Sequence, residues 1–348
     1  MLRMMGSNGD GLRGFYLFLG QVKQYLRIRQ VYSKMALLEV INLKAYFYTT
    51  EGIVKAVDGV DVELNRGEIL SLVGESGSGK TTTGKAILQL APLSGGEIFF
   101  NGEKLDVKNK TQISSFRRKA QMIFQDPYQS LNPRHTILDI VAEALDVNHL
   151  TKNNSERFEL VAQALNDVGM TPAEDFFYRY PYELSGGQRQ RVVIAGAMIM
   201  DPTMIIADEP VSMLDASIRI GILKLMLNLR EKRGLSYLFI THDLSLAWLI
   251  SDRIAIMYLG RIMEIGNAEH IIKNGQHPYT KALTSIMPLL GKGREEYDLL
   301  KGETPNPSEV ISGCKFYSRC PVAKERCSVE MPELRDYGDG NMAACHYL

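Results

Sequence analysis

Cysteine is missing from the first 313 residues of this 348-residue chain, and all four cysteines lie in the last 35 residues. Net charge is also missing, because 40 lysine and arginine residues balance 40 aspartate and glutamate residues. A neutral chain gives no reason to expect nucleic acid or an anionic membrane as the main partner. Long apolar runs are missing too: the longest, Val192 to Met200, has nine residues, whereas a membrane-spanning helix needs about 20.

The first 35 residues differ in composition from the rest, with six lysine and arginine residues against one aspartate. They can form a basic amphipathic helix on a membrane surface or a partner, or a flexible extension ahead of a later start at Met35. We favour the second interpretation. The apolar stretch GFYLFLGQV carries no small-residue cleavage site after it, so no secretory signal is predicted. We therefore expect an intracellular protein, in which disulfides are disfavoured.

The hydrophobic pattern changes along the chain in a way that predicts an α/β fold. From Leu38 it is β-rich, and helical periodicity takes over from about Ile137 to Val168. The short apolar runs TMIIAD and YLFITHD each follow a helical stretch, and this alternation indicates a buried parallel sheet. The stretch DRIAIMYLGRIMEIG predicts a β-hairpin. From Pro278 a helix leads into a loop-rich tail that contains the cysteines.

The stretch GESGSGKTT, from Gly74 to Thr82, fits the pattern G-x-x-x-x-G-K-[ST]. An apolar run precedes it and a helical stretch follows, which is the setting that a phosphate-binding loop requires. The backbone N–H groups of such a loop and the start of its helix favour anions. We predict that Lys80 reaches the β- and γ-phosphates of a nucleotide, that Thr81 ligates Mg²⁺, and that Thr82 contacts the α-phosphate.

A second apolar strand ends in two acidic residues, Asp208 and Glu209. Four apolar residues precede them, so the strand is expected to be buried and to end at the ligand edge of the sheet. Asp208 is predicted to hold Mg²⁺ through water. Glu209, one residue further, is predicted to face the γ-phosphate and to polarise the attacking water.

The stretch LSGGQRQRV predicts a second anion site. Ser185 can cap a helix that begins at Gly186 and Gly187, whose backbone N–H groups are then exposed at the helix start. This site has no lysine of its own. Two half-sites for one phosphate indicate that two chains hold each nucleotide between them.

An LSGGQ sequence between these two motifs resembles the nucleotide-binding subunit of an ABC transporter. Three further motifs occur in the order typical of that family. FQDP places Gln125 near Mg²⁺ and the membrane subunits, SMLD supplies Asp215, and THD places His242 against the γ-phosphate. The resemblance covers about Leu38 to Gly266, and it implies a P-loop NTPase (RecA-like) core with an antiparallel β subdomain and a helical subdomain at about 126–200.

The resemblance also assigns roles to individual residues. Phe47 is the predicted aromatic that stacks on adenine, with Tyr46 and Tyr48 as alternatives. The predicted catalytic residues are Glu209, His242, Lys80 and Gln125. The predicted nucleotide-binding residues are Phe47, Gly74, Glu75, Ser76, Gly77, Ser78, Gly79, Lys80, Thr81, Thr82, Ser185, Gly186, Gly187, Gln188 and Asp215. The predicted Mg²⁺ ligands are Thr81, Gln125 and Asp208.

Longer stretches, FQDPYQSLNPR, DEPVSMLDASI and HPYTKAL, are similar to the oligopeptide/dipeptide importer subfamily, and most of all to its F-type ATPase subunit. This similarity implies an ATPase that energises peptide import at the cytoplasmic face of the membrane. The implied partners are a D-type sister ATPase, two permeases and, indirectly, an extracellular binding protein. Oligosaccharide import by the same subfamily is an alternative, and a soluble ABC protein that acts on ribosomes or DNA is a weaker one. The implied domains are 1–35, 36–275 and 276–348.

The four cysteines follow the spacing C-x5-C-x6-C-x17-C. Thiols in such a tail can be free, paired in disulfides or bound to metal, and the tight cysteine pair of a structural zinc site is missing. Iron–sulfur clusters accept varied spacings, and the related tails imply a [4Fe–4S] cluster here, with Zn²⁺ as the alternative and with His346 as a weaker substitute ligand. The predicted ligands are Cys314, Cys320, Cys327 and Cys345.

Overall fold

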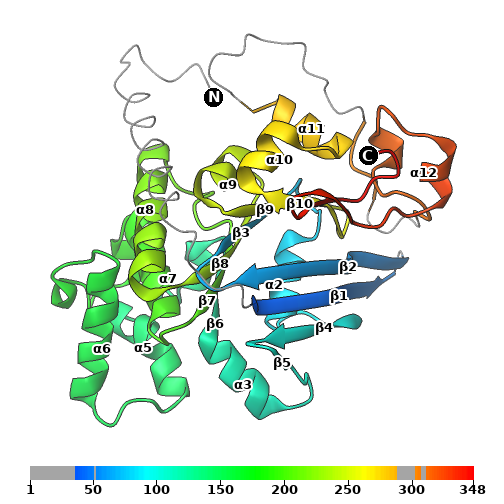
Figure 1. Cartoon of the computed structure of the whole chain (residues 1–348). Helices are drawn as coiled ribbons and strands as arrows, with labels where there is room; N and C mark the ends of the chain where they lie inside the picture. The colour runs from blue at the N-terminus through cyan, green and yellow to red at the C-terminus, as the bar shows by residue number, and fades with distance from the viewer. Residues whose placement is uncertain (1–35, 51, 288–301, 307–310) are drawn as a thin grey trace, which may run out of the picture.

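The computed structural model describes residues 36–50, 52–287, 302–306 and 311–348, so the predicted N-terminal extension lies outside it. Within these residues the strands form a four-stranded antiparallel sheet and an eight-stranded mixed sheet. In Figure 1 the larger sheet runs between the antiparallel sheet and a group of helices. The C-terminal segment packs at the β10 (Arg261–Asn267) edge of this sheet, opposite the β6 (Ala120–Ile123) edge. No helix of the described residues is long and apolar enough to cross a membrane.

The centre of the larger sheet is parallel and buried. Every residue of its three central strands is buried, and alternate residues face different cores. Ile205 and Ala207 face a core shared with the helices, whereas Met204 and Ile206 face one shared with the antiparallel sheet, as the two-residue period of a strand requires. The parallel strands, in spatial order, are β9 (Arg253–Tyr258), β3 (Ile69–Val73), β8 (Ser236–Thr241), β7 (Met204–Asp208) and β6 (Ala120–Ile123).

The antiparallel sheet packs over the helix that follows the glycine-rich loop. Its strands are β1 (Ala36–Thr49), β2 (Gly52–Asn65), β4 (Gly95–Phe100) and β5 (Glu103–Lys104). Two helices accompany it, α2 (Lys80–Ile87) and α3 (Lys110–Lys119).

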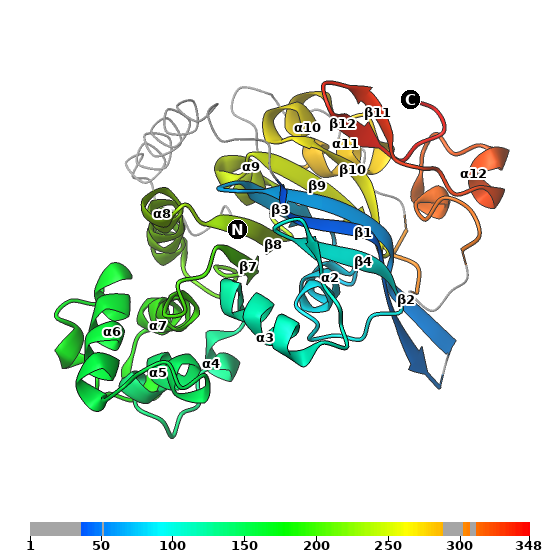
Figure 2. The same ribbon diagram turned by 60° about the horizontal axis from the view of Figure 1, so that its bottom comes forward.

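Residues 126–200 contain helices and no strand. Asp126, Thr136, Asn153 and Ser185 each cap one of these helices by accepting a backbone N–H, as N-cap residues do. Figure 2 shows this group on the side of the molecule away from the C-terminus. Its members are α4 (Pro127–Ser130), α5 (Ile137–Val147), α6 (Asn154–Asp167), η1 (Ala173–Asp175), η2 (Pro181–Glu183) and α7 (Gly186–Met198), and α8 (Ala216–Arg233) packs beside them.

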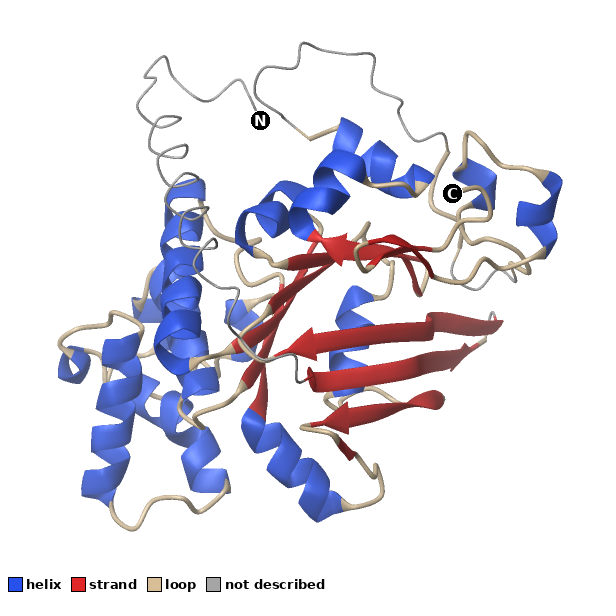
Figure 3. Cartoon of the chain, viewed as in Figure 1, coloured by secondary structure: helices blue, strands red, loops and turns tan. Residues whose placement is uncertain are grey.

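The C-terminal tail contains more regular structure than its composition suggested. A hairpin near its end pairs with β10 and so extends the larger sheet, and Figure 3 shows its strands along the edge of that sheet. The elements after β8 are α9 (Leu244–Ile250), β9, β10 (Arg261–Asn267), α10 (Ala268–Asn274), α11 (Pro278–Ser285), η3 (Tyr317–Arg319), α12 (Glu325–Val329), β11 (Arg335–Gly338) and β12 (Asn341–Ala343). The β9–β10 hairpin was predicted from the sequence and is confirmed.

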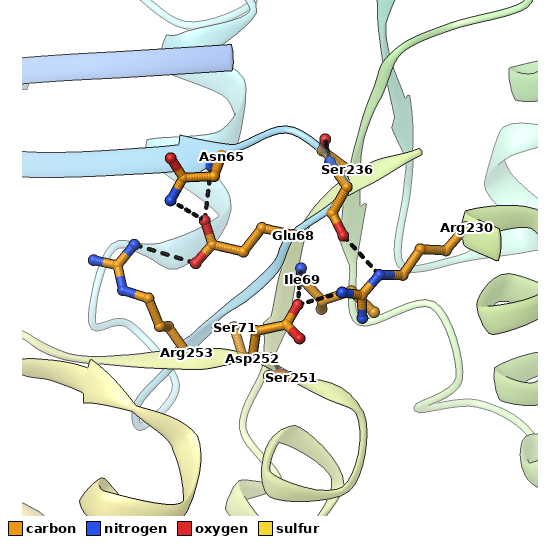
Figure 4. Close-up of polar contacts among 10 residues, drawn as sticks. Asn65, Glu68, Ile69, Ser71, Arg230, Ser236, Ser251, Asp252 and Arg253 are labelled. Atoms are coloured by element: carbon orange, nitrogen blue, oxygen red, sulfur yellow. Dashed lines mark hydrogen bonds and ion pairs between the residues drawn. The ribbon is translucent and has the colours of Figure 1, made fainter. Parts of the chain in front are cut away.

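A polar network fastens the starts of the parallel strands (Figure 4). Arg230 of α8 is buried and donates to the carbonyl of Gly67 and to Asp252. Asp252 also accepts the N–H of Ile69 at the start of β3. Glu68 joins this edge to the antiparallel sheet, because its carboxylate accepts from Asn65 and Arg253. The network lies at the end of β3 opposite the glycine-rich loop.

Candidate functional site

The loop between β3 and α2 is so tightly packed that only glycine fits at two positions. A Cβ on Gly74 would lie 2.1 Å from a backbone oxygen of β9, and a Cβ on Gly79 would lie 2.1 Å from one of β2. Lys80 is buried, and its Nζ donates to the carbonyl oxygens of Gly74 and Glu75 at 2.8 Å each. The ammonium therefore lies inside the loop. Burial lowers the pKa of Lys80, and the nearby carboxylates act in the opposite direction.

Thr81 and Asp208 meet at the entrance of this loop. Thr81 follows Lys80 in α2, and Asp208 is the last residue of β7. The Thr81 hydroxyl donates to the Asp208 carboxylate at 3.0 Å. Burial raises the pKa of Asp208. A hydroxyl and a carboxylate this close provide two hard oxygen donors of the kind that Mg²⁺ prefers, so the residues present fit this ion.

Glu209 lies between His242, which was predicted to contact the γ-phosphate as Glu209 does, and Gln125, which was predicted to lie near Mg²⁺. Its Oε1 contacts Nδ1 of His242 at 2.9 Å, and its Oε2 accepts from Nε2 of Gln125 at 3.2 Å. Gln125 comes just after β6 and His242 just after β8, so all three residues lie at the carboxyl edge of the parallel strands. Glu209 has a backbone φ of 46°, a conformation that costs a non-glycine residue about 1–3 kcal/mol and occurs most often at functional sites.

The LSGGQ stretch forms the predicted helix start. Ser185 Oγ accepts the N–H of Gln188, and the Gln188 side chain accepts the N–H of Ser185. Gly186 and Gly187 are the first two residues of α7. A Cβ on Gly187 would lie 2.7 Å from the Ile218 side chain of α8. The capped helix predicted from the sequence is therefore confirmed. It belongs to α7, whereas Gly74–Thr82 lies between β3 and α2.

The three candidate aromatic residues on β1 differ in their surroundings. The Tyr46 hydroxyl donates to Asp58 at 2.6 Å; burial first, and then this bond, raises the pKa of Tyr46 to about 12. Phe47 and Tyr48 are exposed, Tyr48 at 80%. Phe47 is 36% exposed and stays the predicted adenine-stacking residue, with the more exposed Tyr48 as an alternative.

The predicted residues thus fall into separate groups. One group surrounds the loop and the acidic strand end: Lys80, Thr81, Gln125, Asp208, Glu209 and His242. The others are held elsewhere: Phe47 on β1, Ser185 to Gln188 at the start of α7, and Asp215 just before α8.

Three residues of the C-terminal region contact the loop, and sequence reasoning missed them. The Tyr279 hydroxyl accepts the backbone N–H of Glu75 at 3.2 Å. Arg319 Nη1 lies 2.9 and 3.1 Å from the two carboxylate oxygens of Glu75, and the Thr304 hydroxyl donates to the same carboxylate at 2.6 Å. Tyr279 lies in the HPYTKAL stretch, but no local pattern indicates a contact of any of the three with Glu75, because they lie more than 200 positions from it.

All four cysteines line one pocket at the C-terminal end of the molecule. None of the four forms a disulfide, and Cys314 donates its backbone N–H to the carbonyl of Cys327 at 2.8 Å. Burial raises the pKa of Cys314 to about 11, with smaller contributions from the other three cysteines. The described residues contain no group of three or more His, Cys, Asp or Glu side chains that could hold a metal ion as arranged. His346 is hydrogen-bonded to the carbonyl of Glu330.

Comparison with known proteins agrees with this geometry. Residues 57–212 match the ABC transporter family, and residues 263–327 match the C-terminal region of oligopeptide/dipeptide transporters. The fold is similar to the dimeric ATP-binding cassette MJ0796 bound to ADP and Pi, with a TM-score of 0.60 and 29% identity over 66% of this chain and 98% of that one. The chain belongs to the ABC transporter family of ATP-binding proteins, and the predicted P-loop fold and ATPase class are confirmed.

Curated relatives narrow the class to the oligopeptide type. The chain is 47% identical to the oligopeptide transport ATP-binding protein OppF of Bacillus subtilis, over 80% of this chain and 94% of the relative. It is 43% identical to the putative oligopeptide transport ATP-binding protein YkfD of the same organism, over 90% of this chain and 96% of the relative. The predicted subfamily is therefore confirmed.

Proposed function

We propose that this chain hydrolyses ATP to drive the import of dipeptides or oligopeptides. The observation that carries the proposal is the placement of Glu209 between Gln125 and His242, next to the Lys80 loop, in a chain that also has the oligopeptide-type C-terminal region. The first feature supports hydrolysis and the second supports the cargo.

In the proposed reaction, the Gly74–Thr82 loop binds the triphosphate and Lys80 moves from the loop carbonyls to the β- and γ-phosphates. Glu209 accepts a proton from a water molecule whose oxygen bonds to the γ-phosphorus. The bond from that phosphorus to the β–γ bridging oxygen breaks, and its electrons leave with ADP. His242 and Gln125 hold the Glu209 carboxylate in place, and positioning of this kind supplies much of the catalysis in phosphoryl transfer.

Thr81 and Asp208 would hold Mg²⁺, and Gln125, whose side chain contacts the adjacent Glu209, is the third predicted ligand. The ion supplies positive charge against the β- and γ-phosphates when it is bound. Asp208 is suited to this role because it is 2% exposed, so a charge there needs a cation nearby.

The partners follow from the second anion site. Ser185 and the N–H groups of Gly186 and Gly187 offer a phosphate contact on elements separate from the Lys80 loop, which supports a closed dimer of two cassettes. The proposed sister is a D-type ATPase, and two permease subunits hold the pair at the cytoplasmic face of the membrane, with an extracellular binding protein that delivers the cargo.

The proposal of a metal group rests on the four cysteines that line one pocket, although the thiols are not arranged as metal ligands in this structure. Four thiols from separate segments surround one apolar pocket, and sulfur is the donor that iron–sulfur clusters and zinc take. We propose that Cys314, Cys320, Cys327 and Cys345 hold a [4Fe–4S] cluster that cross-links the tail. Anaerobic purification should give brown protein with iron and sulfide in equal amounts, whereas colourless protein with one zinc per chain would overturn the cluster.

Transport is tested with the complete complex in proteoliposomes. We expect ATP-dependent uptake of labelled dipeptides or oligopeptides, and no uptake by a matched complex that carries Glu209→Gln. Uptake of oligosaccharides with no uptake of peptides would show that the ATPase role is right and the cargo is wrong. ATP turnover by a purified chain that never associates with membranes would refute the transport role.

A further inference from the structure

Within the Gly74–Thr82 loop, the carbonyl, the N–H and the side chain of Glu75 are all held by other residues. Its carbonyl accepts from Lys80 and its N–H donates to Tyr279. Its carboxylate is paired with Arg319 and accepts from Thr304. The residues that hold the N–H and the carboxylate, Tyr279, Thr304 and Arg319, all lie after residue 275. The C-terminal region therefore fixes the start of the loop.

The negative charge on Glu75 would repel a bound nucleotide if Arg319 did not neutralise it. Asp208 and Glu209 already place two negative charges beside the loop, and all three carboxylates act on Lys80. An ATP molecule adds several more negative charges at the same place. Asp208 and Glu209 have roles in metal binding and catalysis, whereas an unpaired Glu75 carboxylate would only repel the phosphates. The guanidinium 2.9 Å away neutralises it.

Arg319 is held firmly enough to act in this way. Its side chain is 7% exposed and lies over the ring of Tyr258, whose hydroxyl it also contacts. Its backbone N–H donates to the carbonyl of Phe316. Phe316 is fully buried and packs against Tyr258 and Tyr279. A side chain that is already ordered loses little entropy when it holds its partner.

We propose that Arg319 is a positioning residue for ATP binding, which acts through Glu75 to keep the loop open to phosphate. The residue lies between Cys314 and Cys320, so the folded cysteine segment becomes part of the nucleotide site. This inference rests on ATP binding at Gly74–Thr82. It depends on neither the cargo nor the metal, and a failure of peptide uptake or of the cluster leaves it standing.

The test compares Arg319→Gln with the unaltered chain in equilibrium ATP binding and in steady-state hydrolysis. We expect the Kd and the KM for ATP to rise roughly 10-fold, at the low end of couplings between distinct sites, while kcat at saturating ATP changes less than twofold. Arg326→Gln is the matched control, because Arg326 pairs with Glu330 on the surface of the same region. It should leave both constants unchanged.

A second variant separates a charge effect from a general loss of structure. If Arg319 acts by neutralising Glu75, the double variant Glu75→Gln with Arg319→Gln should bind ATP more tightly than Arg319→Gln alone. If Arg319→Gln does not fold, Arg319→Lys decides instead: it keeps the charge but loses the paired contact, and its Kd should rise by a smaller factor. The proposal would be overturned if Arg319→Gln and Arg319→Lys both bound ATP with a Kd within twofold of that of the unaltered chain. It would also be overturned if the double variant bound ATP no more tightly than Arg319→Gln.

Discussion

Replacement of Glu209 by glutamine tests the proposed chemistry most directly. The amide has the same shape as the carboxylate, so its contacts to Gln125 and His242 can persist, but it accepts no proton from water. General-base catalysis contributes about 10²–10⁴-fold, which corresponds to about 2.7–5.5 kcal/mol of activation free energy. We therefore expect kcat to fall at least about 100-fold while the affinity for ATP is kept.

A second substitution at the same position separates charge from placement. Glu209→Asp keeps the carboxylate but shortens the side chain by one bond of about 1.5 Å. The present contacts of 2.9 and 3.2 Å would then exceed hydrogen-bond distance. A displacement of about 1 Å can cost about 100-fold in rate, so the aspartate variant should also be slow.

The assay is phosphate release from the assembled transporter at saturating ATP, together with nucleotide binding by each variant. Loss of binding in Glu209→Gln would indicate damage to the loop rather than to the chemistry. A glutamine variant with a kcat within tenfold of the unaltered complex would refute the role of Glu209 as the base.

Three further predictions concern other parts of the molecule. Ser185→Arg should block hydrolysis but leave ATP binding intact, because the arginine fills the anion site of α7; full ATPase activity from a monomer would contradict the dimer. Arg230→Met should lower the free energy of unfolding by about 2–3 kcal/mol, because it leaves the buried Gly67 carbonyl without its side-chain donor and Asp252 without its charge partner. Arg233→Gln at an exposed pair should cost under about 1 kcal/mol, and denaturant titration distinguishes the two variants. Cys320→Ser should lower the iron content and bleach the visible absorption of anaerobically purified protein, and an unchanged spectrum would exclude Cys320 as a ligand.

Sequence patterns predicted the features that depend on neighbouring residues. The buried strand that ends at Asp208 and the helix capped by Ser185 both follow from a few consecutive residues, whose burial and backbone bonds are determined locally. The placement of Glu209 and His242 at one edge of the sheet follows from the rule that parallel strands end at the same edge, whereas their direct contact was not predicted. Each of these features is present in the structure.

The tail was harder to predict, for two different reasons. A local signal for its hairpin was present and overlooked: Asp339 and Gly340 both have positive φ, as an Asp-Gly turn between two strands requires. The Arg319 contact had no local signal. It joins residues 244 positions apart, and an arginine between two cysteines looks like any solvated basic residue until the fold places it against Glu75.

The tail meets the cassette through a second buried charge pair, and this argues that it belongs to the nucleotide site. Lys315 lies 3.6 Å from Asp58, and their side chains are 8% and 10% exposed. Burial lowers the pKa of Lys315, whereas the Asp58 carboxylate raises it. Removal of the Asp58 carboxylate alone, with the tail still docked, would leave Lys315 buried without this partner, at a cost of several kcal/mol. Because Asp58 also accepts from Tyr46 on β1, the cysteine segment contacts the strand that carries the predicted adenine-stacking residue through Lys315, and it contacts the Gly74–Thr82 loop through Arg319.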